Sequence, residues 1–523
     1  MKRYGWLIAL LSLLSVASCF EDRPTATLRS VQVEKDTLVL PVGGSAEVFF
    51  RVDEPGYTFD LEQDVVLYLA KGQFLASEDF FLARVEQDAE PGRYKATVTD
   101  RGRKDDYDEE VCIGVRLPEG VMKLSAPFRC QGEFGGPLGP IKKTGLPILY
   151  LDTQYGAAIV SKTDYVKASV TLHDGAEVSG PVSCNVRGRG NTTWYWPKKP
   201  YLLKLEEKTS FFGFPAHKRW VLLANFLDRT LMRNLVAMKV ASMTSLAWTP
   251  HCRSVELVLN GKPQGTYLLI EQVRVDKNRV NIKDGYLFES DFHYDNEIQW
   301  IDPHGRCVER SDGIPFGIKY PDPDEITPQQ VQEAKDIIAR TAEAIYGPDF
   351  RDPEKGYAAF IDVDSFIDYW IVFEVMGNHE LGNPGSVFYH WDRGGKLKAG
   401  PCWDFDWGVL SYTANPQART GLLLRNACWY SRLFDDPDFR TRTRTRFMEL
   451  LPQLQTIPAY IDETEAYLSR SAELNFRMWN PAEDASMNGG HIINGDERMS
   501  FREAVARLRS TYEERLTVIQ DKL

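Results

Sequence analysis

The amino-acid sequence predicts a mixed α+β protein, in which a small β-sandwich precedes a larger domain of two lobes. Between about residues 25 and 117, short stretches of alternating apolar and polar residues are separated by turns and show no helical periodicity. From residue 146 onward, strand-like stretches come first and helix-like stretches follow. A strand-rich half followed by a helix-rich half is typical of a two-lobed α+β domain.

The composition excludes several classes of protein. A chain of 523 residues with 43% hydrophobic and 26% charged residues is globular, and not disordered, collagen-like or a coiled coil. Its 74 acidic and 62 basic side chains give a net charge of −12, so we expect no nucleic-acid partner. The eight cysteines include no C-x-x-C pair, which argues against a structural zinc site.

The first residues predict a bacterial lipoprotein signal peptide, residues 1–18. Lys2 and Arg3 precede the apolar run Leu7–Leu14, and small residues then lead to Cys19. In this interpretation the chain is cut before Cys19 and that thiol is acylated. The alternatives are an ordinary cleaved signal or an N-terminal membrane helix, but the run is shorter than the roughly 20 residues that span a bilayer. We therefore expect a cell-envelope protein, on the outer membrane or the cell surface, held only by its lipid anchor.

The next segments predict a β module and a linker. Residues 19–118 contain short strands with turns between them, a spacing that suggests an immunoglobulin-like β-sandwich. This module contains no clustered catalytic residue types, so a spacer or adhesion role is its natural interpretation. Residues 119–145 are rich in glycine and proline and predict a linker, which leaves residues 146–523 as the larger domain.

The first half of this domain is predicted to be β-rich. Strand-like stretches occur at residues 147–151, 166–172 and 201–205. Residues 255–259 run into Asn260-Gly261 and return as residues 266–271, which predicts a hairpin with a turn at its tip.

Helices are predicted in the second half, with recognisable start signals. Thr327 and Pro328 are typical of an N-cap and a first helical position. Asp364 is expected to cap a strongly apolar helix that ends at Gly377. Ser500 and Glu503 predict a capping box before the last helix.

A basic turn and two charged strand residues are candidates for anion binding. The run Arg187-Gly188-Arg189-Gly190-Asn191 alternates arginine, which matches phosphate oxygens, with glycine, which lets a backbone approach an anion. A solvated basic loop is the alternative. Lys204 sits among apolar neighbours in a strand, where it could equally point to solvent. Glu271 closes an apolar strand, and a carboxylate there needs a partner or a cleft.

Acidic residues late in the chain are candidates for a metal site. Asp404 and Asp406 stand among bulky aromatic residues, and on an extended backbone their side chains would share a face, which suits Mg²⁺. The alternative is that they cap backbone amides. Upstream, Asn378, His379 and Glu380 follow the apolar helix, a common place for a catalytic loop. His379 has no partner at metal-ligand spacing.

Eight motifs, which include the basic turn and the Asp404–Asp406 segment described above, resemble in sequence and in order those of the spore coat protein H (CotH) kinase family. The resemblance extends from about residue 146 to beyond residue 439. It implies an atypical protein-kinase-like fold that binds a nucleotide with a divalent metal, namely ATP with Mg²⁺ or Mn²⁺, and some members phosphorylate protein partners. The motifs are Arg187–Asn191, Lys198–Tyr201 with Lys204, Trp220–Asn225, Leu231–Asn234, Leu268–Gln272, Asn278–Ile282, Trp403–Asp406 and Leu433–Phe439.

The resemblance also implies roles for individual residues. Asp404 corresponds to the metal-binding aspartate of kinases, with Asp406 as its neighbour. Lys204 and the basic turn, with Arg187, Arg189 and Asn191, would clamp phosphates. Glu271 would orient that lysine or complete the metal shell, and these two roles stay open.

The position of the catalytic loop departs from the family pattern. Enzymatic members often have Asn-x-Asp there, whereas this chain has Asn378, His379 and Glu380, with one more methylene in the carboxylate. The resemblance implies two of the three functions that stay open, and the carboxylates alone suggest the third. The first is a kinase that phosphorylates an envelope or secreted protein, and the second is an inactive kinase-like module that binds a glycan or protein partner. The third is a glycosidase that uses Glu380 with Asp404 or Asp406.

Overall fold

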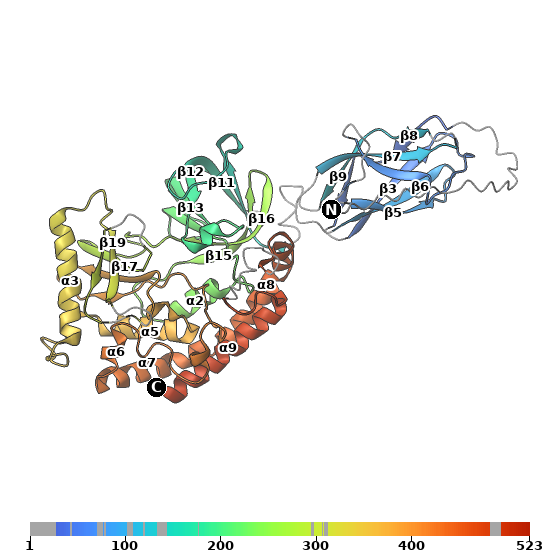
Figure 1. The fold of residues 1–523 in the computed structure, drawn as a ribbon. Coiled ribbons are helices and arrows are strands. Elements are labelled where there is room, and N and C mark those ends of the chain that lie inside the picture. The colour runs from blue at the N-terminus through green and yellow to red at the C-terminus, as the bar shows by residue number, and fades with distance from the viewer. Residues whose placement is uncertain are drawn as a thin grey trace, which may run out of the picture. The chain divides into compact units, whose positions relative to one another are not determined.

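The structure, a computed structural model, describes residues 28–41, 44–70, 77, 80–101, 108–118, 121–132, 144–175, 177–293, 298–305, 307, 312–481 and 493–523 (Figure 1). The predicted signal peptide, with its lipidated Cys19, lies outside these residues. The chain divides into two compact units, Met1–Gly135 and Gly136–Leu523. The mixed α+β class predicted from the sequence is confirmed.

Two β-sheets that enclose one hydrophobic core make up the N-terminal unit. Strand β6 shows how the sequence builds it, because every second side chain is buried. The first sheet has the order β1-β3-β6-β5 and the second β2-β9-β7-β4, with β8 paired to β7. The strands are β1 Val31–Val33, β2 Thr37–Leu40, β3 Ser45–Val52, β4 Val65–Leu69, β5 Phe80–Gln87, β6 Arg93–Asp100, β7 Asp108–Arg116, β8 Met122–Leu124 and β9 Phe128–Gly132. The sandwich's immunoglobulin-like type stays a prediction.

Two of these strands correct the predicted linker. Strands β8 and β9 fall within residues 119–145, and β9 lies between β2 and β7 in the second sheet. Cys130 of β9 is fully buried in the core of this unit. The linker prediction is therefore wrong for residues 122–132, since the glycine and proline residues of this segment hid two short strands.

A closed seven-stranded barrel forms the first half of the C-terminal unit, in the order β10-β11-β12-β13-β14-β16-β15. Parallel pairing of β10 with β15 closes it. The predicted strands and the hairpin at Asn260-Gly261 are confirmed. Bounds are β10 Ile148–Thr153, β11 Val166–Asp174, β12 Glu177–Gly188, β13 Tyr201–Thr209, β14 His217–Leu223, β15 Cys252–Leu259 and β16 Lys262–Glu271.

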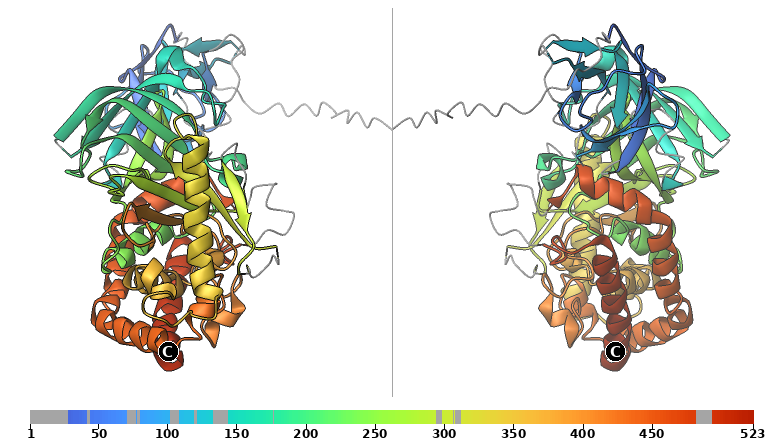
Figure 2. Two further views of the ribbon diagram at one scale, coloured as in Figure 1. Left: turned by 90° about the vertical axis from the view of Figure 1, so that its left-hand side faces the viewer. Right: turned by 90° about the vertical axis from the view of Figure 1, so that its right-hand side faces the viewer.

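Among the described residues, a five-stranded sheet and eight helices make up the rest of the C-terminal unit (Figures 1 and 2). The sheet has the order β18-β19-β17-β20-β21. Its strands are β17 Gly285–Ser290, β18 Gln299–Asp302, β19 Ile314–Tyr320, β20 Val387–Asp392 and β21 Lys398–Ala399. The helices are α2 Arg233–Ala241, α3 Pro328–Tyr346, α4 Tyr357–Phe360, α5 Val363–Met376, α6 Tyr430–Leu433, α7 Pro437–Leu454, α8 Ile457–Met478 and α9 Phe501–Lys522.

Helix α5 is the central helix of this unit and leads into the predicted catalytic loop. Nearly all of its side chains are buried, which explains its apolar sequence on every face. Its N-cap is Asp362, whose side chain accepts a hydrogen bond from Ser365 N, so the prediction of Asp364 as the cap is wrong by two residues. Gly377 ends the helix in the left-handed conformation, as expected. The caps of α3 and α9 are also confirmed.

Two buried cysteines face each other in the same unit. The Sγ atoms of Cys307 and Cys428 lie 3.4 Å apart, and both residues are free thiols. Cys307 lies between β18 and β19, and Cys428 lies just before α6. The pair thus brings together segments that are 121 residues apart in the chain.

Candidate functional site

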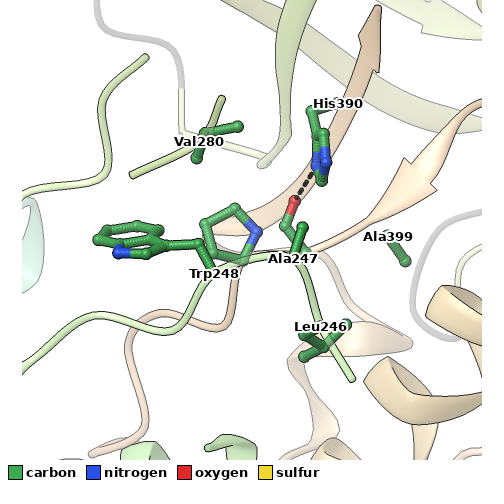
Figure 3. Close-up of a pocket in the computed structure, with 8 residues that line it drawn as sticks. Leu246, Ala247, Trp248, Val280, His390 and Ala399 are labelled. Carbon is green, nitrogen blue, oxygen red and sulfur yellow. Dashed lines mark hydrogen bonds between the residues drawn. The ribbon is translucent and has the colours of Figure 1, made fainter. Parts of the chain in front are cut away.

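A cleft of about 750 Å³ between the barrel and the helical half is the candidate site. Its walls come from the β12–β13 connection, the end of β14, the end of β17, the loop after α5 and the segment before Trp407. Figure 3 shows the residues that line a second pocket, beside His390. The volume of this pocket is only about 10 Å³, which has room for roughly one water molecule. Ligand chemistry therefore belongs to the larger cleft.

Six of the predicted site residues line this cleft, which brings together segments more than 200 residues apart in the chain. They are Arg187, Arg189, Asn191, Glu380, Asp404 and Asp406.

Asp404 and Asp406 are half-buried in one wall of the cleft. The sequence analysis assumed an extended backbone for this segment. That assumption is wrong, because Asp404 has a left-handed φ of 63°. Burial raises the pKa of Asp404 above its ordinary value, although the charge of Arg189 opposes the rise. Burial and the negative charge of Asp404 raise the pKa of Asp406 well above its ordinary value. Two carboxyl groups held in this way favour either protons or a cation.

The segment that carries the two aspartates is fixed from behind by buried polar side chains. Asn234, at the start of α2, accepts a hydrogen bond from Phe405 N at 2.7 Å. Arg233 donates to the carbonyl oxygen of Val409 at 2.9 Å and pairs with two buried aspartates, Asp228 and Asp496. The unusual backbone at Asp404 is thus held by the surrounding fold.

Glu380 enters the cleft from the loop that follows α5. Its backbone N–H donates to the side chain of Asn378, which is buried and caps the short 3-10 helix His379–Leu381. Burial raises the pKa of Glu380 well above its ordinary value, and the charges of Asp404 and Asp406 add to the rise. The Glu380 carboxyl is therefore harder to ionise than an exposed glutamate, and a cation in the cleft would favour its ionised form.

The two arginines of the basic turn face the cleft from the barrel side. Arg189 lies over the ring of Trp403 at 5.5 Å, next to the aspartate segment. Burial lowers the pKa of its guanidinium, and the negative charges of Asp404 and Asp406 partly oppose this effect. Arg187 lines the cleft nearer the outer face of the barrel, where it lies 5.3 Å from the ring of Tyr165.

The glycines of this turn have a different role from the predicted one. A Cβ atom on Gly188 would overlap the indole ring of Trp194, and one on Gly190 would overlap the hydroxyl of Thr193. The space beside each glycine is thus filled by the chain's own side chains. The glycines are needed to close the turn, and the arginines remain as the anion-binding candidates.

Lys204 and Glu271 do not line the cleft. Lys204 is opposite Arg219 in the barrel register, whereas Glu271 is opposite Trp220, whose side chain is inside the barrel. Since neighbouring positions on a strand point to opposite faces, Lys204 and Glu271 lie on opposite sides of the barrel wall. Glu271 instead pairs with His251 at 2.8 Å.

Several residues that line the cleft received no role from the sequence. Lys198 is fully buried and donates to Asn475 Oδ1 at 2.8 Å, and burial lowers its pKa to about 7. Asn225 is 5% exposed, has a left-handed φ of 48°, and its Oδ1 has no hydrogen-bond partner among the described residues. Glu289 and Asp291 add two further carboxylates from the end of β17. The first two stand in the quoted family motifs, which were the available signal.

The acidic residues of the cleft suit a divalent metal ion that is bound together with a phosphate ligand. Within the described part of the chain, no three His, Cys, Asp or Glu side chains are grouped to hold a metal ion. Asp404 and Asp406 offer two carboxylates with raised pKa values in one cleft. Mg²⁺ commonly takes only one or two carboxylates from a protein and completes its shell with substrate phosphates and water. The residues present therefore fit a magnesium–phosphate ligand.

The domain belongs to the class of mixed α+β proteins that hold paired acidic residues and arginines in one cleft. The family model described as CotH kinase protein matches residues 186–519, more than half of the chain, and the chain belongs to this family. The resemblance predicted from the motifs is thereby confirmed, and the protein is kinase-like.

The other comparisons add little. No curated protein matches the chain. Domains 4–9 of surface layer protein SbsC share 13% identity over 38% of this chain and 29% of that chain, with a TM-score of 0.14. Fibronectin(III)-like modules of Clostridium thermocellum CbhA share 10% identity over 36% of this chain and 90% of that chain, also with a TM-score of 0.14. Likenesses at this level carry no argument about fold or function. In the part of the chain that the structure describes, every helix is too short or too polar to cross a bilayer.

Proposed function

We propose that this protein is an atypical kinase that binds a magnesium nucleotide, ATP, in the cleft and transfers its terminal phosphoryl group to a hydroxyl of an envelope or secreted protein. The observation that carries the proposal is the meeting of Asp404, Asp406, Glu380 and Arg189 in one cleft of a CotH-family domain. The barrel and the helical half would then act as the two lobes of a kinase-like fold.

The charges of the cleft support this reaction. Phosphoryl transfer needs phosphates clamped and the acceptor hydroxyl oriented, with little covalent chemistry from the protein. Arg187, Arg189 and Asn191 would bind phosphate oxygens, and Asp404 and Asp406 would hold the Mg²⁺. The metal supplies positive charge against the phosphate oxygens. Glu380 would accept a hydrogen bond from the acceptor hydroxyl and take its proton, once cations in the cleft have lowered its raised pKa.

The N-terminal part of the chain supports a place in the cell envelope. In this proposal Cys19 carries the lipid that attaches the protein to the outer membrane or the cell surface, and the β module is an immunoglobulin-like spacer. Cys19→Ser should then yield an unprocessed or unanchored protein. Normal processing and membrane attachment of that variant would contradict the lipid anchor.

Calorimetric titration of ATP with and without Mg²⁺ into wild type, Asp404→Ala and Asp324→Ala tests the site. Asp324 is exposed and lies outside the cleft, so it controls for the loss of one carboxylate. We expect Asp404→Ala to lose magnesium-dependent affinity at least tenfold while Asp324→Ala stays within twofold of wild type. Circular dichroism checks the fold. Equal affinity in all three proteins would overturn the proposed metal site.

A second function is favoured by one observation, the glutamate at the catalytic-loop position. If Glu380 does not serve transfer, the protein is a kinase-like binding module for a glycan or protein partner. Glu380→Gln separates the two. It should stop transfer of the terminal phosphate of labelled ATP to envelope protein and leave nucleotide binding within about threefold. Absence of ATP binding in wild type would favour the binding module.

A further inference from the structure

A row of basic side chains crosses the outer face of the barrel beside the cleft. Lys167 of β11 is opposite Asn185 of β12, which is opposite Lys204 of β13, which is opposite Arg219 of β14. Directly opposed residues in a sheet share a face. The next row, with Val186, Leu203 and Trp220, lies in the barrel core. The row Lys167–Asn185–Lys204–Arg219, called the basic row below, therefore faces outward.

The basic row has few negative partners. In the structure as described, Lys167, Lys204 and Arg219 form no ion pair with a carboxylate, although the whole chain carries a net charge of −12. Arg219 instead donates to the hydroxyl of Tyr165 at 2.9 Å, and Lys204 lies 5.9 Å from the same ring. Cations left without counter-charges on an acidic protein produce a local positive potential.

The pKa of Tyr165 responds to this positive potential, and its ring lies between the basic row and the cleft-lining Arg187. Burial alone would raise the pKa of its hydroxyl, but Arg187 and Arg219 outweigh that effect and lower it. Arg187 lies over the Tyr165 ring and also lines the cleft. The basic row and the proposed phosphate-binding side of the cleft are thus continuous through Arg187.

We propose that the basic row is a docking surface for an acidic segment of the protein on which the cleft acts. This rests on the proposed function for the identity of the partner. Four neighbouring strands span about 14 Å at the usual spacing, the length of four to five extended residues. Carboxylates along such a segment would replace the counter-charges that the row lacks, and would hold a nearby hydroxyl at the cleft.

The test compares a charge reversal on the row with a matched one beside it. Lys204→Glu/Arg219→Glu changes the row, and Lys218→Glu changes an exposed neighbour on the opposite face of β14. The probes are fluorescein-labelled peptides of six glutamates or six lysines, titrated into the full chain by fluorescence anisotropy without nucleotide. We expect wild type to bind the glutamate peptide at least tenfold more tightly, with affinity falling as salt rises. The double variant should lose at least tenfold, and Lys218→Glu at most twofold.

The same variants are titrated with Mg-ATP, which separates docking from the proposed function. If the double variant loses glutamate-peptide binding but wild type does not bind Mg-ATP, the proposed kinase function is overturned and the docking surface is supported. No preference between the peptides, or an equal loss in Lys218→Glu, would overturn the docking surface. A double variant that loses Mg-ATP affinity but keeps peptide binding would also overturn it. Phosphatidylglycerol vesicles serve as a third probe, and a double variant that loses binding to these vesicles alone would likewise overturn it.

Discussion

At the scale of single residues, Asp404 combines backbone strain with electrostatic repulsion. A left-handed φ costs a residue with a side chain on the order of 1–3 kcal/mol, and Asp404 has φ 63°. Its negative charge also raises the pKa of the nearby Asp406. Neighbours that do not touch the cleft, such as Asn234, hold the segment in place. The aspartates are therefore positioned before any ligand arrives.

Asp406→Asn should stabilise the protein in metal-free buffer, and increasingly so as the pH rises. The folded-state pKa of Asp406 is raised well above its ordinary value by burial and by Asp404. Such a group contributes its full stability below its unfolded pKa, and that stability is lost as the pH rises through the folded pKa. In EDTA, wild type and Asp406→Asn should therefore have the same melting temperature near pH 4. Near pH 8, Asp406→Asn should melt a few degrees higher than wild type.

Addition of Mg-ATP provides the contrast for this prediction. Wild type should gain more in melting temperature than Asp406→Asn, because a cation reverses the cost of ionising the pair. Asp324→Asn, which removes an exposed carboxylate, should follow wild type in both buffers. A variant that melts below wild type at pH 8 in EDTA would show that Asp406 has a structural partner instead.

The sequence identified five of the ten Asp, Glu, Lys and Arg residues that line the cleft. Asp404, Asp406, Glu380 and Arg189 could be predicted because acidic and basic residue types stand out in aromatic or glycine-rich surroundings. Lys204 points to solvent, which is the alternative that the sequence left open, and it does not lie at the cleft as the family resemblance implied, because the face on which a strand residue lies depends on how the barrel closes. That closure is set by contacts between distant segments, such as the pairing of β10 with β15.

At the scale of elements, the start of α5 tests the corrected cap. Asp362→Ala removes the acceptor of Ser365 N and should cost about 1 kcal/mol of unfolding free energy. Asp364→Ala removes a side chain that is 77% exposed and paired with Arg442, and should cost less than about 0.5 kcal/mol. The midpoint of urea unfolding, followed by far-ultraviolet circular dichroism, ranks the two. A larger loss in Asp364→Ala would restore the original prediction.

Local signals predicted elements well, and long-range pairing was where prediction failed. The hairpin turn at Asn260-Gly261 and the capping box of Ser500 with Glu503 involve residues within a few positions, and both are confirmed. Strand β9 was missed because its pairing with β2 joins residues about 90 positions apart. A strand of five residues that is followed by a glycine-rich segment carries no periodicity long enough to recognise.

At the scale of the whole molecule, the N-terminal unit should fold alone only if it includes β9. This unit has its own hydrophobic core, to which β9 contributes the buried Cys130. A fragment of residues 28–135 should therefore show a cooperative thermal transition, whereas residues 28–118 should not, because β2 and β7 lose the strand between them. Cooperative folding of the shorter fragment would show that β9 is dispensable. Circular dichroism and limited proteolysis report the difference.

The facing thiols of Cys307 and Cys428 have a consequence for how the protein matures. In an oxidising compartment, each thiol can give up one hydrogen, so that a disulfide forms while glutathione disulfide is reduced to two thiols. Both cysteines are at most 6% exposed, so the bond should form readily during folding and slowly in the folded protein. Refolding with glutathione disulfide, followed by alkylation and mass spectrometry, should show this pair joined and Cys184 alkylated. If both thiols are alkylated, the pair stays reduced; if they are joined, the bond ties together two segments that are 121 residues apart in the chain.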